Sequence, residues 1–220
     1  SPDLIDGFRY QVKFEGTDSA GNVADPVIID TVTYDTTNPT IAVTSPAEST
    51  SVNDTHVNYI LNEELSFGKW TFTRTDPSAD TASPSVAILT RNDLSFGQHD
   101  ISLTLSPALV DGATYGVKFE GTDLAGNNAT AVIINSVTYD TSKPVFSDIS
   151  PSNSDYVNTA EVEYTLSEDL IDGFVVFTNT GGVADNAPPH LAKLVSLELD
   201  SGSFSLSLIH ISEPTRLGFI

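Results

Sequence analysis

The chain has 220 residues, of which 30 are acidic and 9 are basic, giving a formal net charge of −21 at pH 7. Nucleic acids and anionic membranes are bound through clusters of Lys and Arg, so this balance argues against both as partners. It suits a soluble, self-repelling extended chain, or a chain that binds cations. Cysteine is absent, so packing, with metal as a further option, has to hold the folded parts together.

No apolar stretch approaches the roughly 20 residues that a membrane-spanning helix needs. The chain also has no signal peptide and no Met, not even at position 1. We therefore expect a fragment or a processed product, without membrane insertion in this part of the protein.

The sequence repeats itself at a fixed offset. The segment GTDSAGN at Gly16–Asn22 returns 105 positions later as GTDLAGN at Gly121–Asn127. Across residues 1–39 and 106–144, 26 of 39 positions are identical, and the register then continues without a gap. A fixed period without insertions indicates a tandem array in which each repeat is one structural unit.

Alternation of apolar and polar residues with period two dominates the chain and predicts β-strands rich in Val, Ile, Phe, Tyr and Thr. The predicted strands of one repeat are 41–44, 56–61, 69–74, 85–90, 100–105, 115–121 and 131–139. Pro, Gly, Asn and Asp fill the breaks between them, and no segment has a convincing helical period. Seven short strands in about 100 residues are typical of an immunoglobulin-like β-sandwich, in which Trp70 belongs to the core.

Four motifs connect the chain with a known class of repeat. They are FEGTD-x-AGN, VTYDT-x-x-P, the Ser-Pro at Ser45-Pro46, and L-x-E-[ED]-L. On these motifs the chain resembles the bacterial immunoglobulin-like repeats of very large cell-surface proteins and adhesins. The resemblance reaches to about residue 206 and implies an all-β array of tandem seven-strand sandwiches, located outside the cell on the bacterial surface.

This architecture predicts one complete repeat and two partial ones. Residues 1–38 hold the last two strands of a repeat, residues 39–143 a complete repeat, and residues 144–207 the first five strands of a third. The register decays near Ser207, where the sequence turns basic and loses its alternation. Residues 208–220 resemble a translated sequencing adapter, so we expect a non-native tail there.

Acidic residues recur in three kinds of segment: the turn after the sixth strand, the turn after the second strand, and the linker between repeats. Calcium takes six to eight oxygen ligands, and acidic loops supply them. The resemblance to calcium-stiffened surface repeats implies that Asp123 is a calcium ligand. The fold is expected to gather four carboxylates and one amide at the first junction: Asp35, Glu63, Glu64, Asp123 and Asn127.

The second junction offers Asp140, Glu168 and Asp169, and we expect weaker binding there because its last loop is missing. The alternative is that all these residues only form turns and supply solubilising charge, since Asp bonds back to the backbone in tight turns.

The sequence contains no nucleophile motif, no phosphate-binding Gly loop and no spacing of His residues typical of metal ligands, so we expect no enzyme. The favoured interpretation is a stiff spacer module of a large bacterial surface adhesin. Its partners are then the neighbouring repeats of the same chain, together with an unidentified surface ligand of the parent protein. Two alternatives stay open: a carbohydrate- or protein-binding module, and an accessory domain of an exported enzyme.

Overall fold

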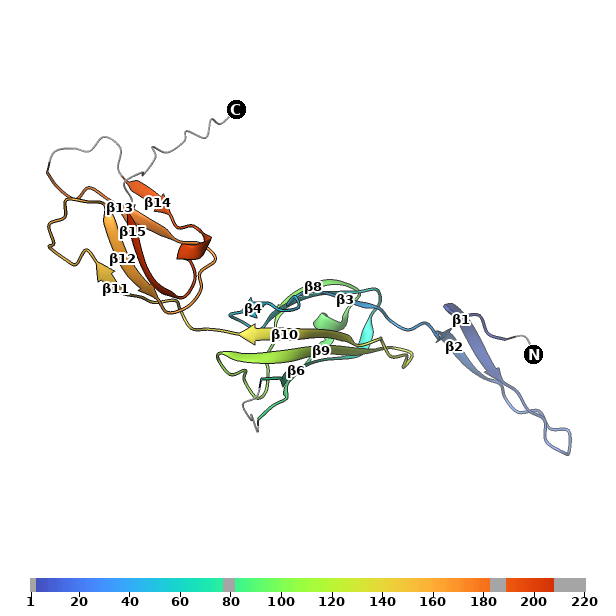
Figure 1. The fold of residues 1–220 in the computed structure, drawn as a ribbon. Coiled ribbons are helices and arrows are strands. Elements are labelled where there is room, and N and C mark those ends of the chain that lie inside the picture. Colours follow the sequence, from blue (N-terminus) through green and yellow to red (C-terminus); the bar gives the residue numbers. More distant parts are fainter. Residues whose placement is uncertain (1–2, 77–81, 183–188, 208–220) are drawn as a thin grey trace, which may run out of the picture. The chain divides into compact units, whose positions relative to one another are not determined.

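The computed structural model describes residues 3–76, 82–182 and 189–207. The chain folds into two compact units, Ser1–Ser142 and Lys143–Ile220. In the described residues the fold is all-β, with two short 3-10 turns as its only helical elements (Figure 1). None of the described helical segments is long and apolar enough to cross a membrane. The predicted tail, 208–220, lies outside the described residues.

The first unit begins with a hairpin of strands β1 (Phe8–Phe14) and β2 (Val27–Tyr34). They pair antiparallel from Phe8 with Tyr34 to Phe14 with Val27. Thr31 adopts a left-handed conformation, with φ of 63°, where the register of the pair shifts by one residue. Such a bulge bends the strand and increases its twist.

The remainder of the first unit is a β-sandwich of two sheets (Figure 1). One sheet has the strand order β3-β5-β8, formed by β3 (Ile41–Ser45), β5 (His56–Leu61) and β8 (Gly97–Ser102). The other has the order β4-β10-β9-β6-β7, formed by β4 (Ser51–Val52), β10 (Val132–Tyr139), β9 (Ala113–Asp123), β6 (Leu65–Arg74) and β7 (Ser85–Ile88). A 3-10 turn, η1 (Arg91–Leu94), precedes β8.

The core lies between the two sheets and is built from the inward positions of each strand. Along β9 every second residue is buried, as period-two alternation predicts. Trp70 is fully buried and its ring stacks on Phe119 with 4.4 Å between centroids. Tyr59, from the opposite sheet, meets the Phe119 ring edge-on at 5.0 Å. The expectation that Trp70 belongs to the core is confirmed, and each such side chain contributes roughly 1.5–3 kcal/mol of burial free energy.

Of the seven predicted strands only 56–61 has the predicted bounds; most others differ by one or two residues at an end, and pairing explains the two largest differences. Strand β6 begins at Leu65 rather than 69, because Leu65 pairs with Asp123 across the sheet although its neighbours do not alternate. Strand β8 spans 97–102 rather than 100–105, because its partner β5 runs antiparallel from Leu61 opposite Gly97 to His56 opposite Ser102. Cross-strand partners, which a single strand's pattern does not reveal, therefore set the ends.

The second unit has a three-stranded and a two-stranded sheet (Figure 1). The first contains β11 (Phe146–Ser150), β12 (Glu161–Leu166) and β15 (Gly202–Ser207), in the order β11-β12-β15. The second pairs β13 (Phe174–Phe177) with β14 (His190–Lys193), and η2 (Ser196–Glu198) lies between β14 and β15. Its buried cluster is small and consists of Tyr164, Leu166 and Leu194.

The offset of 105 found in the sequence is also present in the strand boundaries. Strands β3, β5, β7 and β8 recur 105 residues later as β11, β12, β14 and β15, with both ends of each strand shifted equally. The starts of β1 and β2 recur in the same way as those of β9 and β10. The bulge recurs too, since Thr31 and Ser136 both have left-handed φ values, of 63° and 57°.

Candidate metal site

The turn that follows β9 is organised by the carboxylate of Asp123. Its Oδ1 accepts backbone N–H hydrogen bonds from Ala125, Gly126 and Asn127 at 2.7–2.8 Å. Its Oδ2 accepts one from the side-chain Nδ2 of Asn127 at 2.9 Å. Gly126 has a φ of +99°, a conformation that side-chain-bearing residues rarely adopt. The expected tight turn is therefore present, and it leaves acceptor capacity on Oδ2.

The same turn follows β1, where Asp18 accepts hydrogen bonds from the backbone of Ala20 and Asn22 at 2.9 and 2.8 Å. The two turns differ in their surroundings. Asp123 is buried, with 1% of its surface exposed, whereas Asp18 is exposed. Hydrogen bonds from the turn to the Asp carboxylate are therefore common to both copies, whereas burial of the carboxylate is specific to Asp123.

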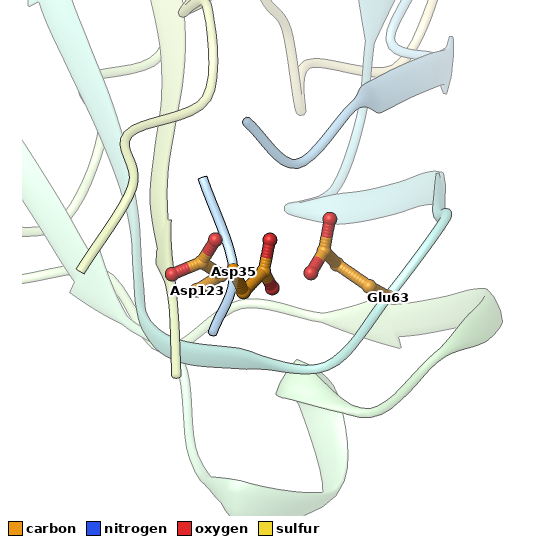
Figure 2. Close-up of side chains that lie close together, drawn as sticks. All are labelled: Asp35, Glu63 and Asp123. Carbon is orange, nitrogen blue, oxygen red and sulfur yellow. The ribbon is translucent and has the colours of Figure 1, made fainter. Parts of the chain in front are cut away.

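Two further carboxylates approach Asp123 from other segments (Figure 2). Asp35 comes from the linker between β2 and β3, and Glu63 from the turn between β5 and β6. One carboxylate oxygen from each of the three residues lies within 4.8 Å of the others. Calcium holds its oxygen ligands at 2.3–2.6 Å, so oxygens on opposite sides of one ion are about 4.6–5.2 Å apart. The three oxygens thus lie within the largest separation that ligands of one calcium ion can have, so the trio can share an ion.

Backbone and side-chain contacts hold Asp35 in place. Its backbone carbonyl accepts a hydrogen bond from Asn127 Nδ2 at 3.1 Å, and its carboxylate Oδ1 accepts the N–H of Thr37 at 3.0 Å. Farther along the same linker, the N–H of Thr40 donates to Asn62 Oδ1 at 2.6 Å. The linker is thus tied to both turns that supply the other two carboxylates.

Of the three carboxyl groups, Glu63 is the one whose pKa is raised. Burial, followed by the negative charges of Asp35 and Asp123, raises the pKa of Glu63 above its usual value. Burial also raises the pKa of Asp123, but the amide of Asn127 and the backbone N–H groups of the turn outweigh it, and the net shift is downward. Within the described residues, no Lys or Arg forms an ion pair with any of the three. In the described part of the chain, the negative charge of the trio is therefore not balanced by an ion pair.

The structure places the other predicted ligands differently. Glu64 is exposed and lines a pocket of about 320 Å³ together with Asp35 and Glu63, but it is not part of the trio. Asn127 turns its amide nitrogen towards Asp35 and Asp123, so it positions both residues by donating hydrogen bonds.

The residues predicted for the second junction lie in different units. Asp140 follows β10 in the first unit and accepts the N–H of Ser142 at 3.0 Å, as Asp35 does with Thr37. Glu168 and Asp169 belong to the second unit. Asp169 accepts the N–H of Ser201 at 2.6 Å, and this contact lowers its pKa. Binding of calcium by these residues stays a prediction.

One polar group was not found from the sequence, because His56 lies more than 40 residues from its two partners. His56 contacts Ser102 Oγ through Nδ1 at 3.3 Å and Asp100 through Nε2. The side chains of His56 and Asp100 are 39% and 63% exposed. Proton-transfer groups act most strongly where water is excluded, and this exposed group does not provide that setting. The absence of enzymatic activity stays a prediction.

Comparison with known proteins finds a distant structural likeness. No family model and no curated protein matches the chain. The crystal structure of the chicken CNTN1 FN1–FN3 domains is similar at 13% sequence identity, with a TM-score of 0.36. The match covers 93% of this chain and 67% of that one. A likeness this distant carries no argument, and the β-sandwich is established here by the sheets and their shared core.

Proposed function

We propose that the chain is a stretch of tandem immunoglobulin-like sandwich repeats with a period of 105 residues. Residues 1–38 supply the last two strands of one repeat, 39–143 form a complete seven-strand repeat, and 144–207 supply the first five strands of a third. The equal spacing of equivalent strands in the two units supports this division. The strand orders β3-β5-β8 and β4-β10-β9-β6-β7 fit an immunoglobulin-like sandwich whose first strand is split between its sheets.

The function that this architecture supports best is that of a stiff extracellular spacer in a large bacterial surface adhesin. Each tandem repeat contacts only its neighbours, so an array provides an extended length and surface. We propose no catalytic role for these repeats. The net charge of −21 keeps such a chain soluble and self-repelling. The partners are neighbouring repeats, and a distant part of the parent protein would bind the surface ligand.

Calcium at the junction is the mechanistic part of the proposal, and one observation supports it. Asp35 belongs to the linker, whereas Glu63 and Asp123 belong to the sandwich, and their carboxylates converge within 4.8 Å. Without a cation the three charges repel one another, and burial together with this repulsion raises the pKa of Glu63. A bound calcium ion turns this repulsion into attraction and links the two sides of the joint. The joint would therefore stiffen when calcium binds.

Titration calorimetry tests this proposal directly. Calcium should bind the wild-type chain with a stoichiometry of about one at the Asp35 joint, and Asp35→Asn should weaken this binding roughly tenfold or more, because affinity follows the number of charged ligands. Asp25→Asn removes an equal charge from the exposed hairpin loop and serves as the matched control. Magnesium should bind more weakly, since it demands a tighter octahedral shell. Equal calcium affinity in both variants would contradict the proposal.

A further inference from the structure

The carboxylate of Asp6 binds the start of the linker that carries Asp35. Asp6 lies in the turn before β1, and its Oδ1 accepts both the N–H and the hydroxyl of Thr36, the hydroxyl at 2.7 Å. Its Oδ2 accepts the hydroxyl of Thr37 at 2.6 Å. Thr36 and Thr37 follow Asp35 directly in the chain. We call this set of hydrogen bonds from Thr36 and Thr37 to Asp6 the linker clamp.

Thr37 connects the linker clamp to the Asp35 carboxylate. Its N–H donates to Asp35 Oδ1 at 3.0 Å, while its hydroxyl donates to Asp6 Oδ2. One residue thus contacts both carboxylates through two different groups. If Thr37 moved away from Asp6, the Asp35 carboxylate would lose this N–H donor. In Figure 2 the Asp35 carboxylate lies between those of Glu63 and Asp123, so the contact helps to keep it within the trio.

The turn that carries Asp6 is itself attached to the hairpin strands. The N–H of Ile5 donates to the hydroxyl of Tyr10 in β1 at 2.7 Å. The N–H of Gly7, which has a φ of +77°, donates to the carbonyl of Tyr34 at the end of β2 at 2.8 Å. Both chain neighbours of Asp6 are therefore bonded to paired strands. A carboxylate supported in this way is placed more precisely than one on a free loop.

The same clamp recurs 105 residues later, in the linker that follows the sandwich. Asp111 accepts the N–H and the hydroxyl of Thr141, the hydroxyl at 2.7 Å, and the hydroxyl of Ser142 at 2.8 Å. The N–H of Ser142 donates to Asp140 Oδ1 at 3.0 Å, the same contact as in the first linker. Among the described residues no second acidic trio lies beside it. The clamp is therefore a feature of the repeat and forms without a calcium site.

The hydrogen bonds keep Asp6 ionised near the acidic trio. Hydrogen bonds from the linker, of which that from the Thr37 hydroxyl has the largest effect, lower the pKa of Asp6. The charge of Asp6 adds, after burial and the other two carboxylates of the trio, to the causes that raise the pKa of Glu63. The two oxygens of Asp6 already accept three hydrogen bonds from the linker, and Asp6 is not one of the three residues whose oxygens converge. These contacts favour a positioning role over a role as ligand.

We propose that Asp6 is a positioning residue of the Asp35 joint: by binding Thr36 and Thr37, it orients the Asp35 carboxylate towards the trio before any ion binds. The consequence for calcium rests on the proposed function, whereas the positioning itself does not. A ligand that is already ordered loses less conformational freedom when the ion binds. Removing a hydrogen bond that orients a metal ligand typically lowers metal affinity roughly 10–100-fold.

Amide exchange in the absence of calcium tests the positioning directly. The N–H of Thr37 donates to Asp35 and not to Asp6, so its exchange with solvent reports on the Asp35 side chain. In Asp6→Ala this exchange, measured by NMR in the presence of a chelator, should become severalfold faster. Asp111→Ala breaks the equivalent clamp of the other linker and should leave the exchange of Thr37 unchanged. Exchange of Thr37 that is the same in Asp6→Ala as in the wild type would overturn the inference.

Calorimetric titration with calcium chloride tests the consequence for binding. Asp6→Ala should weaken calcium binding at the Asp35 joint roughly tenfold. Asp6→Asn can keep its amide oxygen on Thr36 and donate from Nδ2 to the hydroxyl of Thr37. It should therefore lose less than about threefold in affinity, since only a screened charge is removed. Equal losses in the two variants would mean that Asp6 acts through its charge, which is incompatible with the positioning role.

The hydroxyl of Thr37 provides a second pair of variants. Thr37→Val removes the hydroxyl but keeps the N–H that donates to Asp35, whereas Thr37→Ser keeps both groups, as Ser142 has them in the equivalent clamp. Asp6 and Thr37 are exposed, so all these variants should fold. In both measurements Thr37→Val should resemble Asp6→Ala, and Thr37→Ser should resemble the wild type. Wild-type behaviour of Thr37→Val would speak against the clamp.

The two measurements distinguish this inference from the proposed function. A wild type that binds no calcium would contradict the proposed function, and the exchange of the Thr37 amide would still decide whether Asp6 positions Asp35. Calcium binding that is unaffected by Asp6→Ala would overturn the inference and leave the proposed function intact.

Discussion

The side-chain Nδ2 of Asn127 donates a hydrogen bond to the backbone carbonyl of Asp35 at 3.1 Å, although the two residues are 92 positions apart in the chain. The same nitrogen donates to Asp123 Oδ2 at 2.9 Å. One amide group therefore joins the linker to the turn that follows β9. This contact holds the Asp123 carboxylate and the backbone of Asp35 together before any ion binds.

Replacing this amide should cost stability only where it joins two segments. Asn127→Ala leaves partly buried acceptors on Asp35 and Asp123 without their donor, a loss of about 1–3 kcal/mol. Asn22→Ala removes the equivalent amide from the exposed turn at Asp18, so its cost should stay within about 0.5 kcal/mol. Chemical denaturation of the two variants measures the difference. Equal losses would mean that Asn127 only shapes its own turn.

The all-β fold was largely predictable from the sequence, because period-two alternation marks the strands and the internal repeat places equivalent strands 105 residues apart. The strand at 56–61 was predicted with the observed boundaries, and Trp70 was assigned correctly to the core. The start of β6 at Leu65 was missed because its pairing with Asp123 depends on a distant strand. Local patterns locate strands well, whereas their ends depend on partners that the local pattern does not contain.

The candidate site was predictable in outline only. The expected loop positions bring Asp35, Glu63 and Asp123 together. Adjacent residues in the sequence were not distinguished, so Glu64 was predicted with the same weight as Glu63 although it is exposed and outside the trio. The burial of Asp123 was not predictable either, because the equivalent turn at Asp18, which differs by one residue, is exposed. Tertiary contacts, which differ between the two copies, decide the burial.

Removal of the largest core side chain should destabilise the sandwich strongly. Trp70 is fully buried between Tyr59 and Phe119, so Trp70→Ala should cost about 3–5 kcal/mol through lost burial and the cavity left behind. Phe96→Ala, at a 72% exposed position, should change stability by less than about 0.5 kcal/mol. Thermal and urea unfolding monitored by circular dichroism compare the two. A small effect of Trp70→Ala would contradict the assigned core.

The carboxyl group of Asp111 should have an unusually low pKa. The side-chain hydroxyl of Thr141, its N–H, and the hydroxyl of Ser142 donate to Asp111 and lower its pKa to about 2. Because the folded pKa lies below the unfolded one, the stabilisation is present above the usual value of 3.8 and is lost as pH falls towards 2. Carboxyl NMR titration should show this low pKa, and Thr141→Val should raise it. An unchanged titration in that variant would contradict the assigned cause.

Calcium binding at the trio should weaken in acid through Glu63. The pKa of this residue is raised, so in the apo protein it binds a proton at a pH above its usual 4.5. Because the pKa of Glu63 is raised in the folded state, ionisation of Glu63 lowers the folding stability of the apo protein as pH rises through that pKa. A bound calcium ion would offset this loss by attracting the ionised carboxylate. Protons and calcium thus compete, and calcium affinity should decrease as pH falls through this range. Glu63→Gln should bind calcium more weakly and lose most of this pH dependence, which calorimetry at several pH values would measure.

Thermal unfolding with calcium and with a chelator tests the central claim most directly. If the Asp35 joint binds calcium, the ion stabilises the folded state by about 2.7 kcal/mol at one hundred times its dissociation constant, and the melting temperature of the wild type rises. Asp18→Asn, which alters the equivalent turn outside the trio, should keep this rise, whereas Asp35→Asn should lose it. A melting temperature that calcium leaves unchanged in the wild type, or raises equally in Asp35→Asn, would contradict the account.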